Sequence, residues 1–229
     1  IFYEKSLSNF SFKIYKGQKL GIILINWTGK STLLKTLVGN INKISGIYEF
    51  GHNVKIGYFD QQMAQLNSEK TVFDEFYDEF PTLTVTEVRN SLAAFMFYGE
   101  DVFKQVSMLS GGEKVRLALC KILKTGPNLL ILDEPTNHMD IIGKESLENM
   151  LKEYKGTLMV VSHDRFFVNK ISDCILNFEN ENVKFYPYGY EEYLEKKFTE
   201  EKEIIVTQKQ EKVKKQTYIN PLKEKDKLE

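Results

Sequence analysis

The chain has 229 residues, a formal net charge of −1 at pH 7 and hydrophobic residues at 42% of its positions. This length supports one full-sized α/β domain but is short for two. The near-neutral charge provides no global basic field for nucleic acid. The only cysteines, Cys120 and Cys174, exclude a disulfide scaffold and favour a reducing compartment. Because no apolar run approaches the roughly 20 residues of a membrane span and no secretory signal is visible, we expect a cytoplasmic protein.

The first part of the chain predicts a strand, a loop and a helix. Apolar and polar residues alternate at 10–14, which is typical of a strand with one buried face. Residues 19–25 form an almost continuous apolar run, as expected for a strand that is covered on both sides. After a short loop, residues 29–37 predict a helix that ends at Gly39 and Asn40. This order is the context in which a phosphate-binding loop is meaningful.

The rest of the chain continues an α/β pattern. Residues 46–59 predict short strands, and 62–108 predict a small helical insert. Residues 128–132 and 157–161 are two more buried strands of the parallel type, with an amphipathic helix between them. Alternating strands and helices predict a doubly wound sheet. From Glu195 onward, ten lysines accompany eight acidic residues, which indicates a solvated helix or a flexible extension rather than core.

Gly29, Lys30 and Ser31 fit the end of the phosphate-loop pattern G-x-x-x-x-G-K-[ST], but Leu24 replaces its first glycine. Backbone N–H groups at the start of a helix bind phosphate oxygens. We expect Lys30 to reach the β- and γ-phosphates and Ser31 to ligate Mg²⁺. Without other motifs, the same residues could mark an ordinary helix start.

Two adjacent carboxylates, Asp133 and Glu134, follow a buried strand at its carboxyl end, where ligand sites of α/β proteins lie. We expect Asp133 to hold Mg²⁺ through water and Glu134 to orient or activate the attacking water. Alone, the pair could be a strand followed by an acidic loop. Downstream of a phosphate loop, the catalytic interpretation is favoured.

The segment Ser110–Glu113 forms a capping box, in which Ser110 begins a helix and Glu113 lies three residues on. Its two glycines leave the helix N-terminus exposed, which capping alone does not require. An exposed N-terminus with a serine hydroxyl can bind an anion.

Together these motifs resemble the ATP-binding-cassette (ABC) superfamily, and most closely its ABC-F branch. The resemblance covers about residues 1–200 and is carried by the signature segment 109–113, by Asp133-Glu134 with the segment 135–140 that follows, and by the block 162–165. Glu113, where transporters usually carry Gln, points to ABC-F, as do Asn-His in 135–140 and Ser-His-Asp-Arg in 162–165.

The resemblance implies an ABC-type P-loop NTPase core with a mainly parallel sheet, an antiparallel β subdomain and a small helical subdomain. We expect the nucleotide-binding domain to occupy 1–195, with the helical insert at about 62–125, and a charged C-terminal extension to occupy 196–229.

The resemblance also implies roles for individual residues. Gln61, with Gln62 as the second candidate, matches the glutamine loop and would join Ser31 and Asp133 at Mg²⁺. His163 matches the switch histidine that contacts the γ-phosphate and would act beside Glu134. Phe2 or Tyr3 would stack on adenine. The remaining ATP-binding residues would be Asn26, Trp27, Thr28, Gly29, Lys30, Ser31 and Thr32.

In this family, ATP is held between the phosphate loop of one cassette and the signature loop of another. Ser110, Gly111, Gly112 and Glu113 are therefore expected to act in trans, and Asp140 to contact the other cassette. The partner would be a second cassette of the same full-length chain or of a homodimer. Catalysis would then appear only on closure.

The phosphate loop departs from the family pattern Gly-Pro-Asn-Gly-x-Gly-Lys-Ser-Thr at Leu24, Ile25 and Trp27. Glycine allows positive φ and a close approach to phosphate, and forcing a bulky residue into that geometry costs on the order of 1–2 kcal/mol. With crowding added, at about 1.4 kcal/mol per tenfold, we expect ATP affinity to fall by roughly one to three decades. We also expect a distorted or closed loop without nucleotide.

Three functions remain open. The favoured one is the ATPase cassette of a soluble ABC-F protein acting on the ribosome, in translation or antibiotic resistance, with the lysine-rich tail touching rRNA. Residues 89–104 and 219–222, and the start at Ile1 rather than Met, favour the second cassette of a longer chain. The alternatives are the ATP-binding subunit of a membrane transporter, which would dock a membrane subunit near 62–108, and a non-hydrolysing scaffold that forms dimers.

Overall fold

The structure is a computed structural model, and it divides into two compact units, Ile1–Gly189 and Tyr190–Glu229. In the second unit the structure describes one helix, over 190–199, in which the rings of Tyr190 and Tyr193 have centroids 5.6 Å apart. The ranges that the structure describes are 11–24, 30–43, 45–60, 62–65, 67–137, 139–179 and 182–199.

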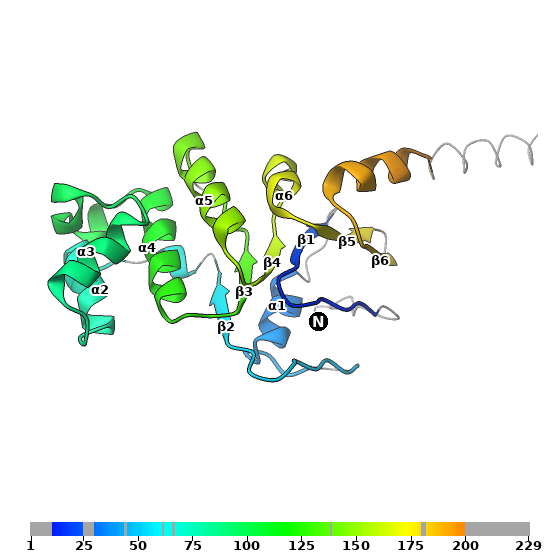
Figure 1. Ribbon diagram of the computed structural model, residues 1–229, viewed down its shortest axis with the longest axis horizontal. Coiled ribbons are helices and arrows are strands. Elements are labelled where there is room, and N and C mark those ends of the chain that lie inside the picture. Colours follow the sequence, from blue (N-terminus) through cyan, green and yellow to red (C-terminus); the bar gives the residue numbers. More distant parts are fainter. Residues whose placement is uncertain are drawn as a thin grey trace, which may run out of the picture. The chain divides into compact units, whose positions relative to one another are not determined.

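Within the described residues, the centre of the first unit is a six-stranded sheet in the order β2-β3-β4-β1-β5-β6 (Figure 1). All neighbouring strands are parallel except the last pair, β5 and β6. The mainly parallel α/β fold that the sequence predicts is therefore confirmed. The strands are β1 (Lys19–Leu24), β2 (Ile56–Phe59), β3 (Leu129–Asp133), β4 (Thr157–Val161), β5 (Cys174–Glu179) and β6 (Asn182–Tyr186).

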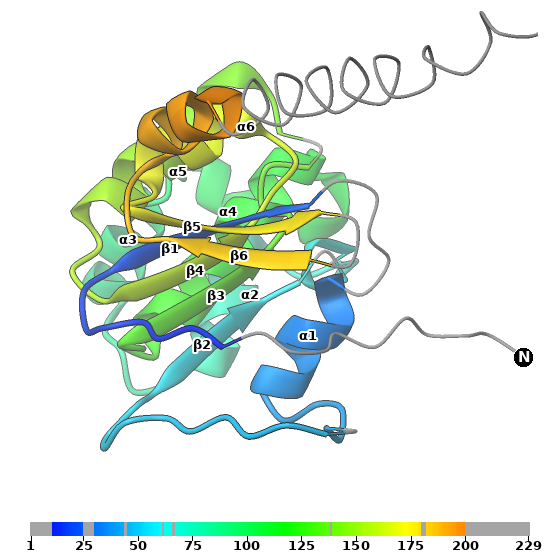
Figure 2. The same cartoon turned by 90° about the vertical axis from the view of Figure 1, so that its right-hand side faces the viewer.

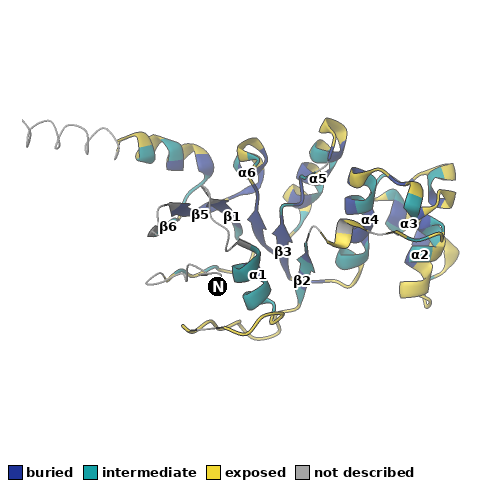
Figure 3. Ribbon diagram, turned by 180° about the vertical axis from the view of Figure 1, so that it is seen from behind, coloured by how far each residue is buried: buried dark blue, intermediate teal, exposed yellow. Residues whose placement is uncertain are grey.

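Helices cover both faces of this sheet (Figure 2). Successive residues of a strand point to opposite faces, and every residue of β3 and β4 is buried (Figure 3). Leu130 packs in the core on one face and Ile131 in the core on the other, which explains why these strands are continuously apolar. One face is covered by α1 (Lys30–Leu37), and the other by α4 (Gly111–Lys124), α5 (Ile141–Glu153) and α6 (Arg165–Ile171).

A separate helical cluster precedes and includes α4. Its own core contains Phe76, Leu92 and Leu117, all fully buried. Thr71 and Thr84 cap the first two helices with their side chains. The helices lie within the insert that the sequence predicts, whereas the expected domain boundaries stay predictions. The elements are η1 (Met63–Gln65), α2 (Val72–Glu79), α3 (Val85–Ala93), η2 (Gly99–Phe103) and η3 (Val106–Met108).

Two segments that the sequence predicts as strands differ in the structure. The described residues at 11–15 and 46–55 form no strand, and within the predicted segment 46–59 only β2, from Ile56 to Phe59, is a strand. Phe12 and Ile14 nevertheless pack against the core on the α1 side, and Lys13 between them is exposed. The period of two thus identified the side chains that face the core. It could not identify backbone pairing, which depends on a partner strand. Within the described ranges, antiparallel pairing is limited to β5–β6 and the isolated bridge between Thr71 and Gln105.

Candidate functional site

The candidate site is built from segments that follow β1, β3 and β4. These strands are parallel, so their carboxyl ends lie at the same edge of the sheet, where α/β proteins bind ligands. Because β4 lies between β1 and β3, the segments after all three strands converge there. They carry Ser31, Asp133, Glu134 and His163.

Ser31 and Asp133 are brought together across 102 residues of sequence. The Ser31 hydroxyl donates a hydrogen bond to Asp133 Oδ2 at 2.6 Å, which is the short distance typical of a hydroxyl on a carboxylate. Asp133 ends β3 and is 5% exposed, while Ser31 lies in the first turn of α1. Mg²⁺ prefers such hard oxygen ligands, one or two carboxylates supplemented by substrate phosphates and water. The two residues therefore fit a Mg²⁺–nucleotide site.

Glu134 and His163 are also brought together. The His163 backbone N–H donates to Glu134 Oε2 at 3.2 Å, and His163 Nε2 lies 3.3 Å from Glu134 Oε1. The Glu134 side chain is 10% exposed and the His163 side chain 58%. A largely buried carboxylate thus meets a histidine that is open to solvent. This arrangement suits a carboxylate that acts on a water molecule beside a group that senses the ligand.

Glu134 has a left-handed backbone, with φ of +51°. Its N–H donates to the Val161 carbonyl at 2.9 Å, which continues the β3–β4 pairing by one residue. For a residue with a Cβ, this conformation costs about 1–2 kcal/mol. Such strain is held by the surrounding structure and is concentrated at functional sites.

A buried hydroxyl pair joins the segments that follow β3 and β4. Thr136 Oγ1 and Ser162 Oγ lie 3.1 Å apart, and Ser162 Oγ accepts a hydrogen bond from the Asp164 N–H at 3.0 Å. Both hydroxyls belong to motifs that carried the resemblance, but sequence reasoning gave them no role. The structure shows that they hold the Glu134 and His163 segments together.

Tyr58 is a third residue that sequence reasoning missed. Its hydroxyl is buried and has no hydrogen-bond partner among the described residues. Burial raises the pKa of the Tyr58 phenol, and the nearby charges of Asp133 and Asp60 raise it further, so the group stays a neutral donor at pH 7. An aromatic residue in a strand looks like ordinary core, and only the side-chain surroundings reveal this donor beside Asp133.

Asp60 orders the segment at which the glutamine loop is expected. Its Oδ1 accepts hydrogen bonds from the N–H groups of Gln62 and Met63 at 3.0 and 3.2 Å. Its Oδ2 lies 3.8 Å from Lys35 Nζ. Because Lys35 belongs to α1, Asp60 connects this segment with the helix that carries Ser31.

The expected signature segment begins α4. Ser110 Oγ accepts from the Glu113 N–H at 3.3 Å, and Glu113 Oε2 accepts from the Ser110 N–H at 2.8 Å, so the predicted capping box is confirmed. Gly112 is buried, and Ser110 and Gly111 are exposed. The hydrogen bonds described for this segment stay within the helix start and do not join it with Ser31 or Asp133. Asp140 caps α5 through Gly143 and is exposed.

Several predicted site residues lie outside what the structure describes. The side chain of Lys30 is among them, although its backbone begins α1. Thr32, in contrast, is described: it lies in α1, where its carbonyl accepts a hydrogen bond from the Thr36 hydroxyl at 2.7 Å. The expected distortion of the phosphate loop also falls outside the described residues, together with Phe2, Asn26, Trp27, Thr28, Gly29 and Gln61.

The family model described as "ABC transporter" matches residues 7–137, more than half of the chain. The chain belongs to the ABC transporter family. The domains of this family bind and hydrolyse ATP, and the convergence of Ser31, Asp133, Glu134 and His163 agrees with such a site. Within the described ranges, no helix of this ABC protein combines the length and apolar character that crossing a membrane requires.

Curated relatives of this ABC protein include members of the F family. It is 46% identical to the ATP-binding protein YdiF of Bacillus subtilis (strain 168), over 90% of this chain and 32% of that protein. It is 40% identical to ABC transporter F family member 5 of Arabidopsis thaliana (81% and 27% covered). It is also 40% identical to the energy-dependent translational throttle protein EttA of Escherichia coli (strain K12) (83% and 35% covered). The chain thus spans about a third of these relatives.

Solved structures confirm the fold. A dimeric, post-hydrolysis form of the ATP-binding cassette MJ0796, bound to ADP and Pi, matches with a TM-score of 0.64 at 22% identity, over 80% of this chain and 91% of that one. The RNase-L Inhibitor matches with a TM-score of 0.64 at 23% identity, over 81% and 37%. At these identities the likeness concerns the fold of an ABC cassette alone.

Proposed function

We propose that this chain is the ATP-hydrolysing cassette of a longer ABC-F protein. The observation that carries the proposal is the pairing of Glu134 with His163 beside the Ser31–Asp133 contact. One pair supplies oxygen ligands for a metal–nucleotide complex, and the other supplies a base next to a ligand-sensing imidazole. Mg²⁺, held by Ser31, Asp133 and Gln61, would neutralise phosphate charge.

In this mechanism Glu134 orients the attacking water and accepts its proton. His163 would contact the γ-phosphate. Lys30 and the N–H groups around 26–32 bind the phosphates, and Phe2 stacks on adenine. Most of the rate enhancement then comes from positioning and charge stabilisation, as in phosphoryl transfer generally.

We further propose that the site is completed in trans. Ser110 and Glu113 lie at an exposed helix start, and Asp140 is exposed at the start of α5. Such groups suit contact with nucleotide or protein presented by a second cassette. The two thirds of each curated relative that this chain does not span leave room for one. We also propose that this is the second cassette of its chain, with the sequence segments 89–104 and 219–222 as the support.

The ribosome is the proposed partner. The support is the 40% identity to F-family members, one of which is named as a translational throttle. The alternative of a transporter subunit predicts a different partner, an integral membrane protein. The two proposals can be distinguished by whether the ATP-bound protein binds ribosomes or an integral membrane protein.

The test uses the full-length protein with Glu134→Gln. Losing the base should lower ATP turnover by about 10²–10⁴-fold while ATP binding persists. The Glu134→Gln protein, which binds ATP without hydrolysing it, should co-sediment with ribosomes when ATP is present. Glu153→Gln, which changes an 85% exposed carboxylate at the end of α5, is the matched control and should behave as wild type. Unchanged turnover in the Glu134 variant would contradict the catalytic role. A pellet without the protein, or a co-purified membrane subunit, would contradict the ribosomal one.

A further inference from the structure

Two ion pairs of equal length join α5 and α6. Lys144 Nζ lies 2.7 Å from Asp164 Oδ2, and Lys170 Nζ lies 2.7 Å from Glu148 Oε2. The first pair lies at the start of both helices, and Asp164 directly follows His163 in sequence. The second pair lies farther along both helices. Both are lysine–carboxylate pairs, but only the first includes a residue next to His163.

Asp164 is the point at which the His163 segment is held. Its Oδ1 accepts from the Phe167 N–H at 3.1 Å, which caps α6. Its own N–H donates to Ser162 Oγ, which pairs with Thr136 in the segment after Glu134. Residues 162–164 are therefore bonded to α6, to α5 and to the segment that follows β3.

The charge of Lys144 matters at this position. Burial pushes the pKa of the Asp164 carboxyl up, but hydrogen bonds from Lys144 and the Phe167 N–H, with the Lys144 charge, hold it below its usual value. The Asp164 carboxylate thus stays ionised, both as the cap of α6 and as the ion-pair partner of Lys144. Lys144 itself lies one turn beyond Asp140, the cap of α5.

We propose that Lys144 is a positioning residue for hydrolysis, which acts through Asp164 to hold His163 against Glu134. The inference rests on the proposed ATPase function. Because Lys144 lies in the first turns of α5, it also links the exposed Asp140 end of that helix with the Glu134–His163 pair. A shift of α5 would thereby be transmitted to the hydrolytic residues.

A merely structural role predicts a different result. Both pairs are partly exposed, so each contributes little to stability, and the side chain of Glu148, at 9% exposed, is more buried than that of Asp164, at 21%. Removing Lys170 should therefore cost at least as much stability as removing Lys144. Only the Lys144 pair contacts the His163 segment.

The experiment measures steady-state ATP hydrolysis by the full-length protein carrying Lys144→Met, Lys144→Arg or Lys170→Met. Misplacing a catalytic group should lower kcat of the Lys144→Met variant about tenfold, with KM for ATP changed less than about twofold. Lys144→Arg should restore most of kcat, and Lys170→Met should leave it within about twofold of wild type. Asp164→Asn, which keeps the cap but removes the ion pair, should reproduce Lys144→Met, and the double variant should be no worse.

Equal losses of kcat in the Lys144→Met and Lys170→Met variants, or no loss in either, would overturn the proposal. Amide hydrogen exchange provides a readout that does not need turnover. Residues 162–167 should exchange faster in the Lys144→Met variant than in the wild type or the Lys170→Met variant. If the wild type hydrolyses no ATP but this contrast persists, the proposed function fails while the positioning contact stands. Identical exchange of residues 162–167 in all three proteins would show that the Lys144–Asp164 contact does not hold this segment, whatever the ATPase activity.

Discussion

Glu134 is the residue at which backbone conformation and proposed chemistry meet. Its φ of +51° is a conformation that glycine adopts freely and that other residues avoid. Its carboxylate bonds both the backbone and the imidazole of His163. The protein therefore retains a strained non-glycine residue where the carboxylate has a use, which is the usual relation between strain and function.

This strain can be measured by comparing two variants that both delete the carboxylate, Glu134→Gly and Glu134→Ala. Glycine relieves the left-handed conformation, whereas alanine keeps the Cβ that makes it unfavourable. The glycine variant should be more stable than the alanine variant by about 1 kcal/mol, measured by urea unfolding. Greater stability of the alanine variant would show that the φ angle costs nothing here. Neither variant should hydrolyse ATP.

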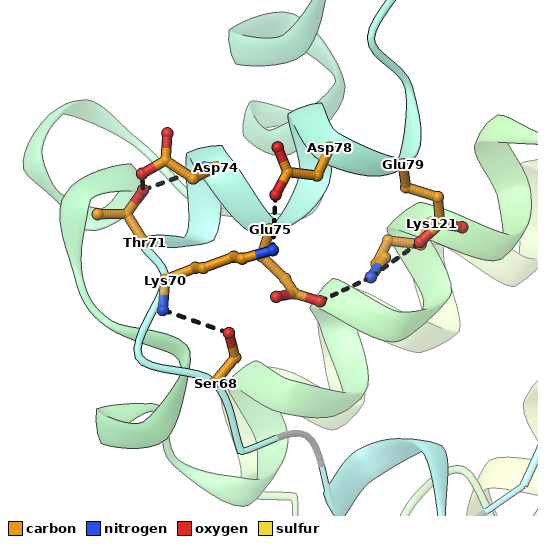
Figure 4. A network of polar contacts seen from close by, with 8 residues as sticks. All are labelled: Ser68, Lys70, Thr71, Asp74, Glu75, Asp78, Glu79 and Lys121. Atoms are coloured by element: carbon orange, nitrogen blue, oxygen red, sulfur yellow. Dashed lines mark hydrogen bonds and ion pairs between the residues drawn. The ribbon is translucent and has the colours of Figure 1, made fainter.

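Among the elements, α2 is attached to α4 by charge as well as by apolar packing (Figure 4). Lys121 of α4 lies 3.0 Å from Glu75 and 2.8 Å from Glu79 of α2. Burial pushes the pKa of Glu75 up, but hydrogen bonds from Lys121 and Ser68 outweigh this effect and hold the pKa below its ordinary value. A second pair in the same network, Lys70 with Asp78, is far more exposed.

Lys121→Met should therefore destabilise the protein at pH 7 by about 1–2 kcal/mol, because it leaves the half-buried Glu75 carboxylate without its cation. A carboxyl whose pKa is depressed by folding contributes stability above its unfolded-state pKa, and this contribution is lost as pH falls through the folded-state value. The difference in stability between variant and wild type should thus shrink as the pH falls through the acidic range in which Glu75 becomes protonated. Urea unfolding of both proteins at pH 7 and pH 3 measures this difference in the free energy of unfolding.

Lys70→Met is the matched control. Lys70 and Asp78 lie 2.7 Å apart in the same network, but both side chains are 56% exposed. An exposed pair contributes at most about 1 kcal/mol, so this variant should stay close to wild type. Equal losses for the two lysine variants at pH 7 would contradict the distinction between them.

At the scale of the whole molecule, the proposed function assigns the cassette two surfaces, the site after β1, β3 and β4 and the signature segment that begins α4. Ser31, Asp133, Glu134 and His163 converge, whereas the hydrogen bonds described for the signature segment at Ser110 stay within its own helix start. The proposed function therefore requires a second cassette to complete each site.

The isolated chain, kept monomeric, should accordingly hydrolyse ATP at least about tenfold more slowly than the full-length protein, because charge stabilisation from the partner is absent. Turnover is measured against chain concentration, with the oligomeric state followed by light scattering. A rate per cassette that rises with concentration supports pairing. A monomer that turns over at the full-length rate would refute the composite site.

The sequence by itself determined several of the elements and nominated the residues for the proposed chemistry. Continuous apolar runs identified β3 and β4, the capping box predicted the start of α4, and residue types nominated Asp133 and Glu134, since each of these depends on neighbours in the chain. Only the tertiary structure decided which groups meet. The Ser31–Asp133, Glu134–His163 and Lys144–Asp164 contacts span 102, 29 and 20 residues. Side-chain distances across such separations depend on strand order and on helix packing, and local sequence does not encode either.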